Sequence, residues 1–171
     1  METVYKDATI EEVNIALVNS KLAFGTYSKE TLKSRAHFLN EVAMELNEIT
    51  DDLLDTAHND THLDKPRLAV ELKRTIFQLT SYAKACEEGT WLDIRIDTAD
   101  KRTDPPKTDL RKMLIPLGPV VVFGASNFPF AYSTAGGDMA CALAAGCTVI
   151  IKAHPAHAAT SEMVANAVQK A

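Results

Sequence analysis

The sequence lacks a surplus of positive charge and any long apolar run. Its 18 Lys and Arg residues are outnumbered by 23 Asp and Glu residues, which gives a formal net charge of −5. No basic cluster stands out, and this argues against a nucleic-acid-binding surface. The longest apolar stretches, around 113–125 and 139–151, are interrupted by Gly, Pro or Thr. Both fall short of the roughly 18 residues of a membrane-spanning helix, so we expect no membrane attachment. The amino terminus has no basic region followed by an apolar run, so no signal peptide is predicted.

Cysteines and metal-ligand patterns are also sparse. The three cysteines, Cys86, Cys141 and Cys147, are odd in number and form no CxxC pair. This argues against a disulfide framework and indicates a reducing cytoplasm. We interpret each thiol as a small buried hydrophobe rather than a nucleophile. His154 and His157 are three residues apart, but no other His or Cys cluster lies near them in sequence, so no metal site is predicted.

The first 90 residues have the pattern of helices. Thr9 and Glu12 form a capping box before the first helix. Ser28 and Thr50 are the predicted caps of the next two helices. The fourth is predicted to start near 64–66, at Asp64 and Pro66, and to stop at Gly89. We interpret its apolar stripe as core rather than as a cofactor site, and it consists of Leu68, Leu72, Ile76, Leu79, Tyr82 and Cys86.

A change of pattern follows at Trp91. Residues 91–97 alternate between apolar and polar, which is typical of a half-buried strand. Residues 98–109 are charged and carry prolines, so they form a solvated loop or the end of a hairpin. Residues 110–115 can be the returning strand. Such a two-stranded arm is marginal alone and would need a partner surface.

From Pro116 onward the pattern is β-α-β-α. Strands are predicted at 120–123 and 148–151, the second ending on Lys152. The intervening helix is expected to run from near Phe130 to Gly146, and a last helix from about 159 to 171. We therefore predict an α/β fold in three segments. Residues 1–90 are helical, residues 91–115 form the arm, and residues 116–171 form the first half of a Rossmann-like parallel sheet.

Polar residues follow both predicted strands, where open parallel sheets place their ligands. The amide of Asn127 could donate into a cleft and stabilise a carbonyl oxygen as it becomes negative, or it could bond its own backbone in a turn. Lys152 could bond ribose hydroxyls or a phosphate, or it could be a solvated residue at the strand end. Neither GxGxxG nor GxxxxGK[ST] is present. Gly136 and Gly137 fall inside the predicted helix, so close approach to the sheet or to a ligand should offset their cost.

Taken together, these residues resemble the N-terminal part of the aldehyde dehydrogenase superfamily. The match is specific over residues 116–162, PLGPVVVFGASNFPFAYSTAGGDMACALAAGCTVIIKAHPAHAATSE. Within the superfamily, this stretch is most similar to the subgroup that acts on 2-oxoglutarate semialdehyde (2,5-dioxopentanoate) and on fatty aldehydes, usually with NADP. The helical first hundred residues are similar in layout but carry weaker motifs.

The resemblance implies a role for each matching position. Asn127 matches an asparagine whose amide helps to form the oxyanion hole, and Lys152 matches a lysine that contacts the adenosine ribose. Many members bond both ribose hydroxyls through a glutamate where this chain has Pro155. Without that carboxylate a 2′-phosphate is not repelled, so NADP is expected, with NAD as the alternative. His154 is expected to contact a cofactor phosphate or to be a plain loop residue. The passage between cofactor and substrate would be lined by Ser126, Phe128 and Pro129.

The resemblance also implies an activity for the parent enzyme. A cysteine thiolate adds to the aldehyde, a hydride passes to the nicotinamide, and water hydrolyses the thioester. In the family, that cysteine and a glutamate lie downstream of the region that this chain matches, so we expect the isolated chain to be inactive. The full-length form is expected to be a cytoplasmic homo-oligomer that takes a small aldehyde substrate and no nucleic acid. The alternative is a truncated, non-catalytic module that pairs with a full-length subunit through the arm.

Overall fold

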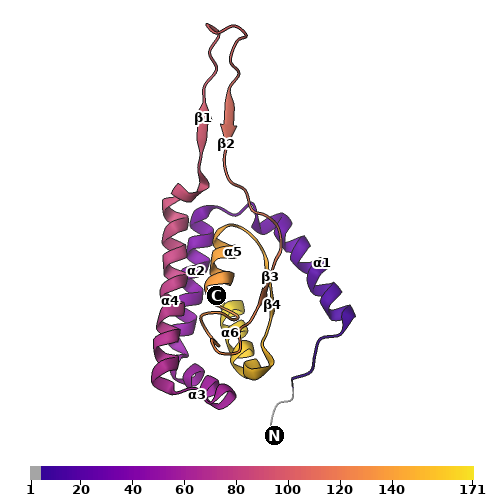
Figure 1. The fold of residues 1–171 in the computed structure, drawn as a ribbon, viewed down its shortest axis with the longest axis vertical. Helices are drawn as coiled ribbons and strands as arrows, with labels where there is room; N and C mark the ends of the chain where they lie inside the picture. Colours follow the sequence, from indigo (N-terminus) through magenta and orange to yellow (C-terminus); the bar gives the residue numbers. More distant parts are fainter. Residues whose placement is uncertain (1–4) are drawn as a thin grey trace.

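The computed structural model describes residues 5–171 (Figure 1). Residues 1–4 lie outside the described residues. The predictions of a helical segment over 1–90 and of no signal peptide therefore have no outcome for these four residues. The described α-helices are α1 (Ile10–Tyr27), α2 (Leu32–Glu48), α3 (Thr50–Thr61), α4 (Lys65–Glu88), α5 (Gly137–Ala144) and α6 (Ala158–Lys170). The strands are β1 (Arg95–Asp97), β2 (Leu110–Lys112), β3 (Val120–Phe123) and β4 (Val149–Lys152).

The predicted helix starts are partly confirmed. Thr9 and Glu12 form the capping box of α1: the Thr9 hydroxyl accepts from the Glu12 amide at 3.2 Å, and the Glu12 carboxylate accepts from the Thr9 amide at 2.7 Å. The prediction of Ser28 as the cap of α2 is wrong. Ser28 follows α1 in a helical conformation, and Thr31 caps α2 by accepting from the Ser34 amide at 3.0 Å.

The prediction for Thr50 is also wrong. Thr50 is the first residue of α3 rather than its cap, and α3 has no side-chain cap. Its hydroxyl instead donates back to the Asn47 carbonyl at 2.9 Å, in the last turn of α2, which ends at Glu48. The fourth helix is confirmed: α4 starts after Asp64 with Pro66 in its first turn, and Gly89 ends it in the left-handed conformation with a φ of 64°.

The core lies where α2, α4 and α5 pack together (Figure 1). The predicted stripe on α4 is confirmed, since Leu68, Leu72, Leu79 and Cys86 are at most 1% exposed. Ile76 and Tyr82 pack against the same cluster and are partly buried. The helices therefore form a layer on which the parallel strands and their connecting segments are built.

The arm projects from the body in Figure 1. β1 and β2 pair antiparallel, with Arg95 opposite Lys112 and Asp97 opposite Leu110. All six of their residues are exposed, so the prediction of a half-buried strand is wrong for β1. Both strands are shorter than predicted. β1 starts late because Trp91 belongs to a short 3-10 turn (Thr90–Leu92), and β2 ends at Lys112. Its indole donates back to the Ala85 carbonyl at 3.1 Å, which keeps the chain against α4.

β3 and β4 pair in parallel, and α5 connects them along the chain, which confirms the β-α-β unit. Val120 lies opposite Val149, and Phe123 lies opposite Lys152. α5 starts at Gly137 and not near Phe130, so residues 124–136 form a long loop. Gly136 caps α5 rather than lying inside it. A side chain at Gly136 would overlap the Ala131 carbonyl, so close approach to the loop, not to the sheet, explains this glycine.

Of the helices within residues 5–171, none is long and apolar enough to cross a membrane.

Candidate functional site

The loop 124–136 begins beside the end of β4. The Gly124 amide donates to the Lys152 carbonyl at 3.0 Å, one step beyond the ladder of β3 and β4. A side chain at Gly124 would come within 3.3 Å of the His154 backbone nitrogen and 3.2 Å of the Ser133 hydroxyl. The carboxyl ends of the two strands therefore meet at one edge, as expected for a parallel pair.

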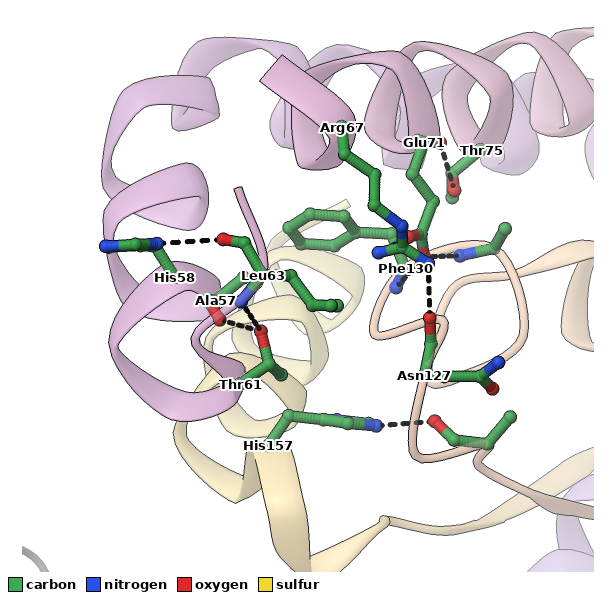
Figure 2. Close-up of polar contacts among 12 residues, drawn as sticks. Ala57, His58, Thr61, Leu63, Arg67, Glu71, Thr75, Asn127, Phe130 and His157 are labelled. Carbon is green, nitrogen blue, oxygen red and sulfur yellow. Dashed lines mark hydrogen bonds and ion pairs between the residues drawn. The ribbon is translucent and has the colours of Figure 1, made fainter. Parts of the chain in front are cut away.

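A buried carboxylate of α4 holds the middle of this loop (Figure 2). Glu71 is 5% exposed, and its Oε1 accepts from the backbone amides of Phe130 at 2.8 Å and Ala131 at 3.0 Å. Its Oε2 lies 3.4 Å from Nη1 of Arg67, one helical turn away. Two consecutive loop amides thus share one acceptor that comes from a segment about 60 residues earlier.

Arg67 holds the start of the same loop. Its Nη2 donates to the Asn127 backbone carbonyl at 2.6 Å, as Figure 2 shows. Its guanidinium also lies over the Phe128 ring, 5.1 Å from the centroid, where a cation is attracted to the aromatic face. Arg67 and Glu71 therefore hold the loop residues before and after Pro129, and Pro129 is itself buried.

A third contact comes from the segment after β4. His157 is fully buried, and its Nε2 lies 2.8 Å from the Ala125 carbonyl. Because a carbonyl only accepts, Nε2 carries the hydrogen, and Nδ1 accepts from the Ser161 hydroxyl at 3.2 Å. His157 is thus a tether of the loop.

The residues predicted for the site are brought to this edge, but they differ in exposure. Phe128 is half-buried and Pro129 is buried, so both act mainly through loop packing. His154 is half-buried, caps the short turn Pro155–His157 through Nδ1 at 3.1 Å from the Ala156 amide, and stacks on His157. The predicted residues that are exposed at this edge are Ser126, Asn127, Lys152 and Pro155.

The side-chain amide of Asn127 is not used to hold the loop. The bond between Arg67 and Asn127 runs through the backbone carbonyl, and the amide takes no part in the contacts drawn in Figure 2. The alternative in which Asn127 bonds its own backbone is therefore not what shapes this turn. The amide is left available at the surface.

The cysteines lie away from the loop. Cys86 and Cys147 are buried as predicted, whereas Cys141 is exposed on α5, so the prediction of burial is wrong for that residue. Burial raises the pKa of the Cys86 thiol. Among residues 5–171, no group of three or more His, Cys, Asp or Glu side chains is arranged to hold a metal ion.

Three comparisons relate this arrangement to known proteins. The Aldehyde dehydrogenase family model matches residues 2–171. The chain belongs to the aldehyde dehydrogenase family. It is 44% identical over 169 residues to the alpha-ketoglutaric semialdehyde dehydrogenase of Acinetobacter baylyi, and 46% identical over 169 residues to alpha-ketoglutaric semialdehyde dehydrogenase 2 of Azospirillum brasilense. Each alignment covers 98% of this chain and 32% of the relative, so the chain spans about a third of the length of these relatives.

Solved aldehyde dehydrogenases share the fold. A double mutant of the betaine aldehyde dehydrogenase of Staphylococcus aureus, in complex with NAD+, superposes with a TM-score of 0.85 at 20% identity, covering 99% of this chain and 33% of that one. The family match and the two relatives confirm the resemblance that residues 116–162 carried.

The sequence did not point to Arg67 or Glu71. A signal was nevertheless present, because Glu71 lies three residues after Leu68 and directly before Leu72, inside the apolar stripe of α4. A charged residue in such a stripe requires a partner, and Arg67 is at the i−4 position where helical side chains meet.

Proposed function

We propose that residues 116–171 form the part of an NAD(P)+-dependent aldehyde dehydrogenase that binds the cofactor and the substrate oxyanion. The observation that carries the proposal is the parallel pairing of β3 and β4, which brings the Asn127 loop and Lys152 to one edge. In this proposal residues 5–90 supply the helical support, and residues 91–115 supply the arm.

The exposed groups at this edge fit an anionic dinucleotide. Lys152 ends β4 and is exposed, so its ammonium can bond ribose hydroxyls or a phosphate. His154 lies two residues further, close enough in the chain to face the same ligand. Pro155 stands where a carboxylate would favour NAD+, and the first acidic residue after Lys152 is Glu162. We therefore propose that NADP+ is preferred, with NAD+ as the alternative.

Asn127 is proposed to be the catalytic donor. Its amide is exposed on a loop whose backbone is fixed by Arg67 and Glu71, and such a rigid donor can stabilise the oxyanion of a tetrahedral adduct. Ser126, Phe128 and Pro129 would line the passage beside it. When bound, the nicotinamide accepts a hydride from the substrate. The names of the two curated relatives support 2-oxoglutarate semialdehyde as the substrate.

The isolated 171 residues are proposed to be inactive. Cys86 and Cys147 are buried, and the raised pKa of Cys86 keeps its thiol protonated. Cys141 lies on α5 rather than in the loop. The three free thiols are also consistent with a reducing cytoplasm.

The test uses the full-length product of the gene and 2-oxoglutarate semialdehyde. We expect kcat/KM to be higher with NADP+ than with NAD+, and strong NAD+ selectivity would count against the cofactor assignment.

The Asn127→Ala variant should lose about 10²–10³ in kcat, as when one oxyanion donor is removed. Asn166→Ala, an exposed asparagine on α6, is the matched control and should retain wild-type kcat. The 171-residue chain should give no turnover, and cysteine-dependent formation of NADPH by it would refute that expectation.

The exposed arm supports a role in assembly. Ile96 and Leu110 on its strands are 63% and 59% exposed, so a second subunit could cover them and form a homo-oligomer. The same feature supports the second candidate, a non-catalytic module that pairs with a full-length subunit. Co-purification of the chain with a longer homologous subunit would favour the module, whereas an in-frame continuation of the gene would favour the enzyme.

A further inference from the structure

One face of α4 contacts the loop that carries Asn127. Its polar residues recur at helical spacing and meet successive loop positions: Arg67 binds the Asn127 carbonyl, Glu71 binds the Phe130 and Ala131 amides, Arg74 donates to the Tyr132 hydroxyl at 2.8 Å, and the Gln78 side chain packs against Gly137. Residues four apart on a helix share one face. The loop is therefore shaped from a distant part of the chain rather than by its own sequence.

The hydrogen bond to Asn127 itself comes from Arg67. A peptide unit is planar, so a bond to the Asn127 carbonyl fixes the plane that follows its Cα. Rotation in the next residues is restricted, because proline fixes the φ of Pro129 and Glu71 holds the amides of Phe130 and Ala131. The backbone from which the Asn127 side chain extends is thereby restrained.

Glu71 orients Arg67 in turn. The carboxylate uses Oε1 for both loop amides and leaves Oε2 for the guanidinium at 3.4 Å. The Glu71 side chain is 4% exposed, whereas that of Arg67 is 39% exposed. Arg67 can therefore be shortened at the surface without opening the core, and a melting curve of the variant separates its effect on kcat from the loss of the partner of Glu71.

We propose that Arg67 and Glu71 are positioning residues that hold the Asn127 amide in the direction needed for an oxyanion. The inference rests on the proposed function of Asn127, and it assigns to α4 a role in catalysis beyond its role in the core. Neither residue needs to touch the substrate. Each acts through the backbone of the loop.

A double-mutant cycle in the full-length gene product tests this inference. Arg67→Ala removes the bond to the Asn127 carbonyl, and we expect kcat to fall between about 10-fold and 10²-fold with KM little changed, since a misplacement of about 1 Å can cost 10²-fold. A donor that acts only in the transition state affects kcat rather than KM. If Arg67 acts through Asn127, the double variant with Asn127→Ala should lose no more than Asn127→Ala alone.

Glu71→Gln separates the two functions of the carboxylate. The amide oxygen of Gln can still accept both loop amides, but its NH2 group cannot pair with the guanidinium. We expect a loss in kcat of about 3-fold to 10-fold, smaller than that of Arg67→Ala, because the loop bonds survive while Arg67 loses its orientation. Lys84→Ala is the matched control. It removes an exposed cation of α4 that also pairs four residues away, with Glu88 at 3.8 Å, and it should keep the wild-type kcat.

The outcomes distinguish the positioning role of Arg67 from the proposed function of Asn127. If Asn127→Ala loses kcat and Arg67→Ala does not, the positioning role is wrong and the function of Asn127 stands. Additive losses in the double variant would also overturn the positioning role, because Arg67 would then act independently. If Asn127→Ala keeps its kcat, the proposed function of Asn127 fails, and the role of Arg67 fails with it. A variant that melts early but keeps kcat per folded enzyme would show that its residue supports only the fold.

Discussion

Replacing Gly136 with alanine should destabilise the protein because there is no room for a methyl group. The φ of Gly136 is −74°, which any residue adopts, so the backbone conformation itself is not the obstacle. An added Cβ would overlap the carbonyl of Ala131 and lie 3.0 Å from the Phe130 carbonyl oxygen. Both neighbours are backbone atoms of the loop, and Glu71 holds their residues in place through the amides. They therefore cannot move aside without breaking those bonds.

The expected size follows from this clash. Forcing extra volume into a packed site typically costs about 1–3 kcal/mol. For a protein of this size, 1 kcal/mol corresponds to about 2–4 °C in Tm. We therefore expect Gly136→Ala to lower the Tm of the chain by about 2–12 °C, measured by circular dichroism and checked by urea denaturation.

Gly25 provides a control of opposite sign. It lies inside α1, it is exposed, and an added Cβ would meet nothing within 4 Å. Alanine in a helix interior is favoured over glycine by up to about 1 kcal/mol. Gly25→Ala should therefore leave the Tm unchanged or raise it by up to about 4 °C. Equal melting temperatures for wild type and Gly136→Ala would refute the reasoning, and so would a loss in Gly25→Ala as large as that in Gly136→Ala.

Three further predictions concern the cofactor, the alkaline limit of stability and α6. Pro155→Glu in the full-length gene product should shift the ratio of kcat/KM towards NAD+ over NADP+ by about 10-fold or more, because a carboxylate would repel the 2′-phosphate; an unchanged ratio would contradict the assignment. Burial raises the pKa of Tyr27 to about 12, so its contribution to stability is complete below pH 10 and is lost as the pH rises towards 12. Tyr27→Phe should flatten the fall in the free energy of unfolding over that interval, and equal slopes would count against this cause. Asp60→Ala should cost about 0.5–2 kcal/mol in urea denaturation, because Asp60 accepts from the Thr160 amide at 2.9 Å and from its hydroxyl at 2.8 Å. Asp60→Asn should recover most of that loss, and a loss equal to that of Asp60→Ala would exclude capping as the reason.

The sequence predicted those features whose causes are local or periodic. The Thr9 cap depends on Glu12, three residues away, and the stripe of α4 depends on a repeat that any helix imposes. The strands at 120–123 and 149–152 consist mainly of apolar residues, and a short helix between them allows their parallel pairing. The wrong cap at Ser28 has a local cause as well, since one turn of chain, held by the bond from the Glu30 amide to the Tyr27 carbonyl at 3.0 Å, separates α1 from α2.

The loop 124–136 could not be predicted in the same way. The sequence placed a helix start near Phe130, although Gly, Ser, Thr and Pro in this loop are poor helix formers. The loop instead gives its amides at Phe130 and Ala131 to Glu71, an acceptor about 60 residues earlier in the chain. The Ala131 carbonyl accepts from the Gly137 amide at 3.1 Å and the Tyr132 carbonyl accepts from the Ala125 amide at 2.8 Å, so neither carbonyl is paired as it would be in a helix over the same residues. The contact with Glu71 is a tertiary contact that no short window of sequence contains.

The positive charge of Arg67 offsets the negative charge of Glu71 beside the loop. A buried carboxylate next to the proposed site for an anionic cofactor and a developing oxyanion would oppose both, since two like charges in a protein of low polarity repel strongly. Arg67 lies 3.4 Å from that carboxylate, and the pair together carries no net charge. The loop therefore gains a strong acceptor for its amides without adding a negative field at its surface. Lys152 is then the charge that an approaching phosphate would meet.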